Sequence, residues 1–158
     1  MPINTVCSSD LNLNALHEAV DGGHLSVVRT LLEPGIEADT FTWTGRPALH
    51  IAIDGRNDFI TIALIEAGAA LDARSRTGHT TIQIVAIVGN AQIVESLIEH
   101  GADVNAKLPD NKSAIEMAAA GRQHPKRKRV YHKIVSILIM SGADLVSETE
   151  EQAEVLHA

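Results

Sequence analysis

The sequence is poor in aromatic residues and in cysteine, and both shortages limit what the protein can be. Aromatic residues account for 3% of the 158 positions, so small aliphatic side chains must form the core, which suits closely packed helices. Cys7 is the only cysteine, so an internal disulfide is excluded. No cysteine and histidine cluster has metal-ligand spacing, and we expect neither a metal nor a cofactor. A reducing, intracellular compartment is the natural expectation.

Long apolar runs are also missing. The longest strongly apolar stretch, 82–88, is interrupted by Gln83 and is far too short to span a bilayer. Residues 1–6 have neither the basic start nor the apolar run of a secretory signal. We therefore expect a soluble, cytoplasmic protein that does not bind membranes.

Charge is distributed unevenly along the chain. The formal net charge is −7, yet residues 122–133 contain six basic side chains and no acidic one. The remaining 7 basic and 20 acidic residues give the rest of the chain a charge of −13. Because nucleic acid binding needs a wide basic face, this balance argues against nucleic acid as a direct partner.

The strongest positive signal is an internal repeat with a constant spacing of 33 residues. One column of the repeat contains Ala15, Ala48, Thr81 and Ala114, and the next contains Leu16, Leu49, Ile82 and Ile115. Gly35, Gly68 and Gly101 keep the same spacing, whereas Gly142 comes later than this spacing predicts, because the last unit has eight extra residues. A period of this length is typical of a solenoid, in which each unit buries its apolar face against its neighbours.

Each unit is predicted to consist of a turn and two antiparallel helices. In the second unit, residues 45–48 form a turn signal, and Gly55 with Asn57 ends the first helix. A second helix is expected between Asp58 and Gly68. The apolar residues expected to face inward are Leu49, Ala52, Ile53, Ile60, Leu64 and Ile65.

Four copies of one short pattern connect the sequence to a known family. The pattern T-P-L-H-x-A is matched in register by residues 14–19, 47–52, 80–85 and 113–118, and G-A-D-V-N-A is complete at 101–106. Over residues 11–145 the chain resembles the ankyrin repeat family. The resemblance implies an all-α solenoid of stacked helix-turn-helix units with finger turns. Gln83 and Glu116 replace the histidine that the family pattern has in this position.

The resemblance also implies the boundaries of the units. The repeats would span about 11–41, 42–74, 75–107 and 108–145, with an insertion at 122–131 that we expect to form an extended loop. Residues 1–10 would be an N-terminal extension. Residues 146–158 would be a capping helix or a tail, since Ser147 and Glu150 have capping-box spacing.

The family resemblance implies a protein-binding function without catalysis. The binding residues are expected on the concave face, at the fingers and at the exposed ends of the first helices. They are Trp43, Thr44, Arg46, Asp54, Arg76, Thr77, His79, Ile87, Val88, Asp110 and Lys112. The eight histidines do not indicate an active site, because the repeat places neither a nucleophile nor a base beside them.

Two features of this face each allow two interpretations. Trp43, the only tryptophan, is expected at a finger tip, where it would either anchor a partner or fold back on a neighbouring finger. Ile87 and Val88 replace the polar and small residues of the second unit. They would either form an apolar binding strip or pack against the insertion.

The basic run of the insertion, Lys126, Arg127, Lys128 and Arg129, resembles a nuclear import signal. The alternative is a solvated loop that contacts the acidic surface of this chain or of a partner. An import signal would add the nucleus to the expected locations.

Three functions remain open at this point. The leading one is an inhibitor or adaptor that binds another protein, as a monomer. The second is an immunity-type protein whose acidic surface neutralises a basic toxin. The third is a small-molecule or enzymatic groove that would use Asp54, His79 and Glu116.

Overall fold

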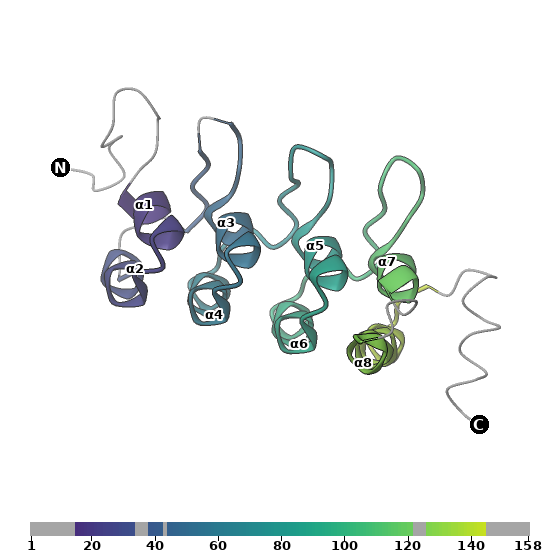
Figure 1. Ribbon diagram of the computed structural model, residues 1–158. Coiled ribbons are helices and arrows are strands. Elements are labelled where there is room, and N and C mark those ends of the chain that lie inside the picture. The colour runs from purple at the N-terminus through teal and green to yellow at the C-terminus, as the bar shows by residue number, and fades with distance from the viewer. Residues whose placement is uncertain (1–14, 34–37, 43, 122–125, 145–158) are drawn as a thin grey trace. The chain divides into compact units, whose positions relative to one another are not determined.

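The computed structural model describes residues 15–33, 38–42, 44–121 and 126–144, and these are helical apart from their connecting turns (Figure 1). The helices are α1 Ala15–Asp21, α2 Leu25–Leu31, α3 Ala48–Asp54, α4 Asp58–Glu66, α5 Thr81–Val88, α6 Ala91–Glu99, α7 Ala114–Gly121 and α8 Lys128–Met140. In the described ranges the only β-pairing is an isolated bridge between Phe41 and Pro47. The predicted all-α fold class is confirmed. The extensions 1–10 and 146–158 lie outside the described residues.

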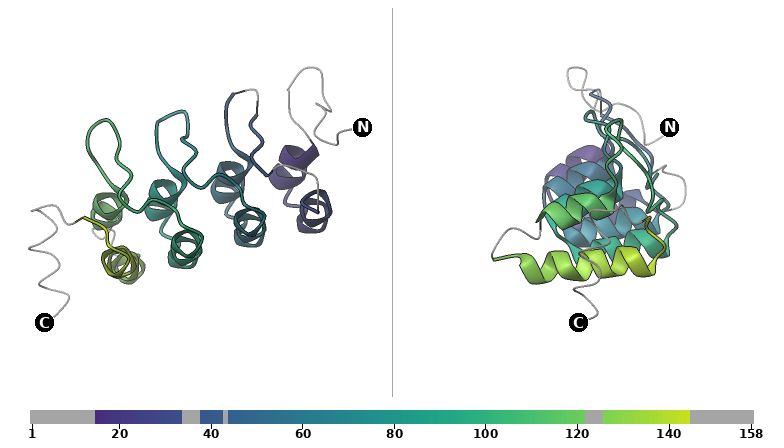
Figure 2. Two further views of the ribbon diagram at one scale, coloured as in Figure 1. Left: turned by 180° about the vertical axis from the view of Figure 1, so that it is seen from behind. Right: turned by 90° about the vertical axis from the view of Figure 1, so that its right-hand side faces the viewer.

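The helices recur with the period of the sequence. The first helices of the four pairs begin at Ala15, Ala48, Thr81 and Ala114, which are the four members of one repeat column. Figure 2 shows a finger loop rising from the start of α3, and another from the start of α7, on the side away from the second helix of the pair. Each of the four units therefore has its two predicted helices, and the predicted turn precedes α3, α5 and α7.

The chain divides into two compact parts, residues 1–81 and 82–158. In the first part, α1 packs on α2 and α3, and α4 packs on α2 and α3. Leu49, Ile60 and Leu64 are at most 1% exposed, as the predicted inward faces require. Burial of an aliphatic side chain of this size contributes about 1.5–3 kcal/mol, so these residues supply much of the stability of this part.

In the second part, α8 packs on both α6 and α7. Leu97, Ile115 and Leu138 are fully buried there. Asn90 caps the start of α6, since its side-chain oxygen accepts a 3.2 Å hydrogen bond from the backbone nitrogen of Ile93. This cap fixes where the second helix of the third pair begins.

Buried polar side chains of the first helices bond to the segment that leads to the next finger. The Nε2 atom of His17 lies 3.0 Å from the carbonyl oxygen of Thr40, shortly before the finger at 42–46. In the third unit, Gln83 Nε2 donates to the carbonyl of Ala106 at 2.7 Å, over the same separation in sequence. Gln83 therefore takes over the bond of the missing histidine. An amide and an imidazole can both present a nitrogen donor at this position.

Glu116 occupies the same column but makes a different bond. Its Oε2 accepts from the backbone nitrogen of Ser113 at 2.7 Å and from the Ser113 hydroxyl at 3.1 Å. The bond from the Ser113 nitrogen is one half of a capping box, and it satisfies a backbone donor at the start of α7. The fourth unit thus uses this position to begin its own helix.

The end of α3 differs from the expected glycine stop. Gly55 closes the helix with φ −71°, which is an ordinary right-handed conformation. The left-handed conformation belongs to the next residue, Arg56, with φ 54°. The corresponding residues of the first and third units are Gly23 and Gly89, with φ 72° and 80°. The second unit therefore carries a bulky side chain where its neighbours have glycine.

The insertion also differs from its prediction as a loop over 122–131. Lys128–Tyr131 form the first turn of α8, which has 13 residues where the other helices have 7 to 9 (Figure 2). The physical reason is the packing of Tyr131, which is 5% exposed and lies against Gly121. A buried ring at this position holds the preceding residues in register with the helix. Residues 122–125 lie outside the described ranges.

Candidate protein-binding surface

Thr44, Arg46, Arg76, Thr77 and His79, predicted binding residues of the first part, lie on two fingers that are closed by their own hydrogen bonds. In the finger at 42–46, the backbone nitrogen of Thr42 donates to the carbonyl of Arg46 at 2.9 Å, and Gly45 nitrogen donates to the carbonyl of Thr42 at 2.8 Å. The Thr42 and Thr44 hydroxyls lie 2.8 Å apart. Gly45 makes the turn possible with φ 74°. Trp43, the expected anchor of this finger, lies outside the described residues.

The next finger, at 75–79, has the same internal bonds. Ser75 nitrogen donates to the His79 carbonyl at 2.8 Å, and Gly78 nitrogen donates to the Ser75 carbonyl at 2.8 Å. At the tip, the Thr77 hydroxyl lies 2.8 Å from Nδ1 of His79. Arg76 and Thr77 are exposed and His79 is half-buried. These side chains are presented to solvent from a backbone that is already ordered.

The finger of the second part, at 108–112, is closed by a 2.9 Å bond from the nitrogen of Leu108 to the carbonyl of Lys112. Asp110 and Lys112 form an ion pair at 2.9 Å. The hydrogen bond from Lys112 lowers the pKa of Asp110, and the same bond raises the pKa of Lys112. Both side chains are exposed, so the pair contributes little to stability and is available to a partner.

Two further predicted residues, Arg46 and Asp54, form an ion pair with each other. Arg46 comes from a finger and Asp54 from the end of α3, so the pair ties the finger to its own helix. Both side chains remain about half exposed, at 44% and 52%. The arrangement leaves one neutralised pair at this edge in place of two independent charges.

Phe41 is a candidate anchor that the sequence reasoning missed. Its side chain is 50% exposed at the base of the first described finger. The equivalent residues of the next two units are Arg74 and Lys107. Phe41 could therefore have been found from the sequence, as a large apolar residue at a repeat position where these two units have a cation. Phe59 on α4 is 71% exposed and lies on a second helix, away from the finger of its own unit.

Ile87 and Val88 lie at the end of α5, and both contact the insertion through their backbones. The hydroxyl of Tyr131 donates to the carbonyl of Ile87 at 2.7 Å, and Arg127 Nη1 donates to the carbonyl of Val88 at 3.1 Å. The side chain of Ile87 nevertheless stays 49% exposed, and that of Val88 is half-buried. The backbone of this segment contacts the insertion, as the packing interpretation requires. The side chain of Ile87 faces solvent, as an apolar binding strip requires.

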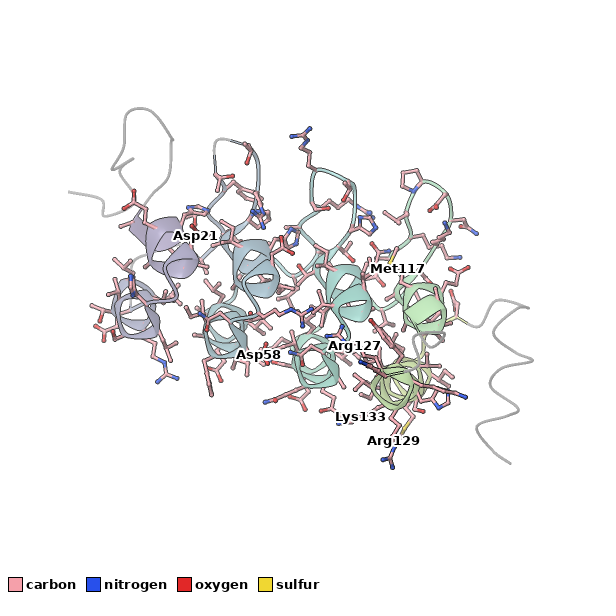
Figure 3. All side chains as sticks on the ribbon, viewed as in Figure 1. Asp21, Asp58, Met117, Arg127, Arg129 and Lys133 are labelled. Atoms are coloured by element: carbon pink, nitrogen blue, oxygen red, sulfur yellow. The ribbon has the colours of Figure 1, made fainter. Side chains whose placement is uncertain are left out.

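The basic run of the insertion is divided between two directions. Arg127 points toward α5 and α6, whereas Arg129 points away from the neighbouring helices (Figure 3). Lys126 lies in a turn, while Lys128 and Arg129 are helical. An import carrier reads cations on an extended strand, and this segment is not extended from Lys128 onward. Lys133 pairs with Glu95 at 3.1 Å.

The three residues of the suggested enzymatic groove each have a local bond. Asp54 pairs with Arg46, His79 meets Thr77, and Glu116 caps the start of α7. Across the described residues, no three histidine, cysteine or acidic side chains are gathered so as to hold a metal ion.

His17 and His50 are buried structural residues. Burial lowers the pKa of both imidazoles, that of His50 to about 4, since desolvation disfavours the charged form. Nε2 of His50 lies 3.0 Å from the Thr81 hydroxyl. Neutral rings in these bonds suit a structural link between turns rather than proton transfer.

The paired helices, their constant period and the closed fingers define a helical repeat protein. The family model described as ankyrin repeats (3 copies) matches residues 3–75 and 58–149. The chain therefore belongs to the ankyrin repeat family. No curated protein matches the chain. A search of the described helices finds none that is long and apolar enough to cross a membrane.

Proposed function

We propose that this chain is a non-catalytic protein-binding module that holds its partner on the fingers and on the exposed end of α5. The observation that carries the proposal is the shared construction of the fingers at 42–46, 75–79 and 108–112. Each finger is closed by bonds of its own backbone and presents exposed side chains from the tip. An ordered surface loses little conformational entropy on binding, which favours affinity.

The contacts that a partner would make are mixed in character. Phe41 and Ile87 provide half-exposed apolar side chains, and Arg76 with Lys112 provides charge. Aromatic and aliphatic anchors surrounded by polar residues are the usual composition of a protein interface. Trp43, two residues after Phe41 in the sequence, would add a second aromatic anchor. The bound protein would be inhibited or relocated by occupancy of this surface, inside the cell.

Affinity capture from a cell extract, with the chain immobilised, tests this proposal. Wild type is compared with Phe41→Ala, Trp43→Ala and Ile87→Asp, and the captured proteins are identified by mass spectrometry. We expect one set of proteins to be retained by wild type and lost from all three variants, because truncation of an anchor removes most of the binding energy. Circular dichroism of each variant verifies that the fold is kept.

Phe59→Ala is the matched control, since Phe59 is more exposed than Phe41 but lies on α4. This variant should retain the whole set. If the captured proteins are lost from Phe59→Ala and kept by the finger variants, the partner binds elsewhere and the proposal is wrong.

A further inference from the structure

We propose that Arg127 recognises a carboxylate of the bound partner, and that the partner segment presents this carboxylate beside an apolar residue that contacts Ile87. The inference rests on the proposed function and names the chemistry of the partner. It concerns the second part of the chain alone, where the insertion meets the end of α5.

Arg127 is held in place by a hydrogen bond that uses only part of its capacity as a donor. Its Nη1 donates a 3.1 Å hydrogen bond to the carbonyl of Val88, and the side chain is only half-buried. A guanidinium has five N–H donors in a fixed plane, so most of its capacity remains for another acceptor. None of the ion pairs in the described part of the chain involves Arg127.

Tyr131 fixes the position from which Arg127 reaches α5. Its hydroxyl donates to the carbonyl of Ile87 at 2.7 Å, and its ring closely approaches both Gly89 and Gly121. The backbone nitrogen of Tyr131 bonds to the carbonyl of Arg127 at 3.2 Å, within the same helical turn. The guanidinium therefore lies beside Val88. The preceding residue, Ile87, exposes half of its side chain.

The local charge favours an acidic group over any other. Lys126 and Lys128 flank Arg127 and are both exposed, and the first turn of α8 contains no acidic residue. Glu95 forms an ion pair with Lys133, further along this helix. Arginine binds carboxylates through two parallel hydrogen bonds, which lysine cannot do. The described surroundings therefore suit an aspartate or glutamate that follows or precedes an apolar residue.

A short protein segment fits this place better than a nucleic acid. The chain outside residues 122–133 has a charge of −13, which repels a long polyanion. A single carboxylate on a protein needs only the local contact, and the apolar side chain of Ile87 adds a surface that a phosphate backbone would not use.

A library of short random peptides displayed on phage, selected against the full chain, tests the inference. Wild type should enrich peptides in which aspartate or glutamate lies next to an apolar residue. The enrichment should disappear with Arg127→Ala and weaken with Arg127→Lys. Arg129→Ala removes the same charge from a nearby side chain that points outward, and it should leave the enrichment unchanged.

The best selected peptide is then synthesised with its acidic residue and with the matching amide. Wild type should bind the amide form about tenfold more weakly, whereas Arg127→Ala should bind the two forms equally. Tyr131→Phe removes the hydrogen bond to the Ile87 carbonyl but keeps the ring that packs against Gly89 and Gly121, and this packing should still hold Arg127 in place. It should lower stability and keep the preference for the acid, which separates recognition from a purely structural role.

The inference is overturned if wild type shows no acidic enrichment, or if the enrichment survives in Arg127→Ala. Peptides bound without acidic preference but lost with Ile87→Asp would overturn this inference alone. A partner whose capture is unaffected by Phe41→Ala, Trp43→Ala and Ile87→Asp would instead count against the proposed function.

Discussion

The ring of Tyr131 lies directly against Gly121, so close that a Cβ added to this glycine would come within 2.4 Å of the ring. The two residues belong to α8 and α7, and the ring is 5% exposed. The contact explains how the eight-residue insertion is incorporated without disturbing the helix pair. It also yields the first prediction.

We expect Gly121→Ala to lower the free energy of unfolding by about 1–3 kcal/mol, because the added methyl overlaps a ring that cannot move away. In an exposed helix the same substitution would stabilise by about 1 kcal/mol, so even the sign is informative. Urea unfolding of the wild type and of Gly121→Ala measures the change in the free energy of unfolding. In the background of Tyr131→Ala the penalty should vanish, since the two residues are in contact. Equal penalties in both backgrounds would show that the ring is not the cause.

The second prediction concerns stability between about pH 6.5 and 4. The pKa of His50 is lowered to about 4 by burial, against an ordinary value of 6.5. As the pH falls below 6.5, the unfolded chain takes up a proton that the folded chain does not, so the free energy of unfolding decreases. The loss should approach about 3 kcal/mol at pH 4. Thermal or urea unfolding across this range measures it.

His50→Gln should remove most of that pH dependence. Gln83 occupies the equivalent position of the next unit and makes the link to the following turn as an amide. The glutamine at 50 should therefore keep much of the stability at neutral pH. A smaller dependence of the free energy of unfolding on pH should remain because of His17, since burial lowers the pKa of this residue as well. If the slope is unchanged in His50→Gln but lost in the exposed control His100→Gln, the assignment is wrong.

The third prediction is a gain of stability at Arg56. This residue has φ 54°, which costs a side chain about 1–2 kcal/mol, and the first and third units have glycine there. Arg56→Gly should raise the free energy of unfolding by about 0.5–1 kcal/mol after the greater entropy of the unfolded glycine is subtracted. Arg29→Gly, within α2, should have the opposite effect. A loss of stability with Arg56→Gly would mean that the arginine side chain makes a contact worth more than the strain.

The fourth prediction tests the core of the second part. Leu97 on α6 is fully buried, so Leu97→Ala should cost about 2–5 kcal/mol through lost burial and the cavity that remains. Gln92→Ala on the exposed side of the same helix should change stability by less than about 0.5 kcal/mol. An unchanged midpoint for Leu97→Ala in urea would exclude it from the core.

The fold class, the helix pairs and the inward residues could all be predicted from the sequence. Ile60 and Leu64 were assigned to the core from spacing alone, and both are fully buried. Such assignments are possible because each unit repeats the same local contacts. Residues at one position of the repeat therefore share one physical environment in all four units. The positions of finger residues such as Arg76 followed from the same columns.

Contacts that depart from the repeat could be found only in the folded structure. The pairing of Arg127 with Val88 and of Tyr131 with Ile87 joins residues 39 and 44 positions apart, outside the period of the sequence. The exposure of Phe41 likewise depends on which neighbours cover it. A repeat predicts contacts that recur in every unit, whereas an insertion makes contacts that occur once. Those depend on side-chain packing in three dimensions, which no column of the sequence records.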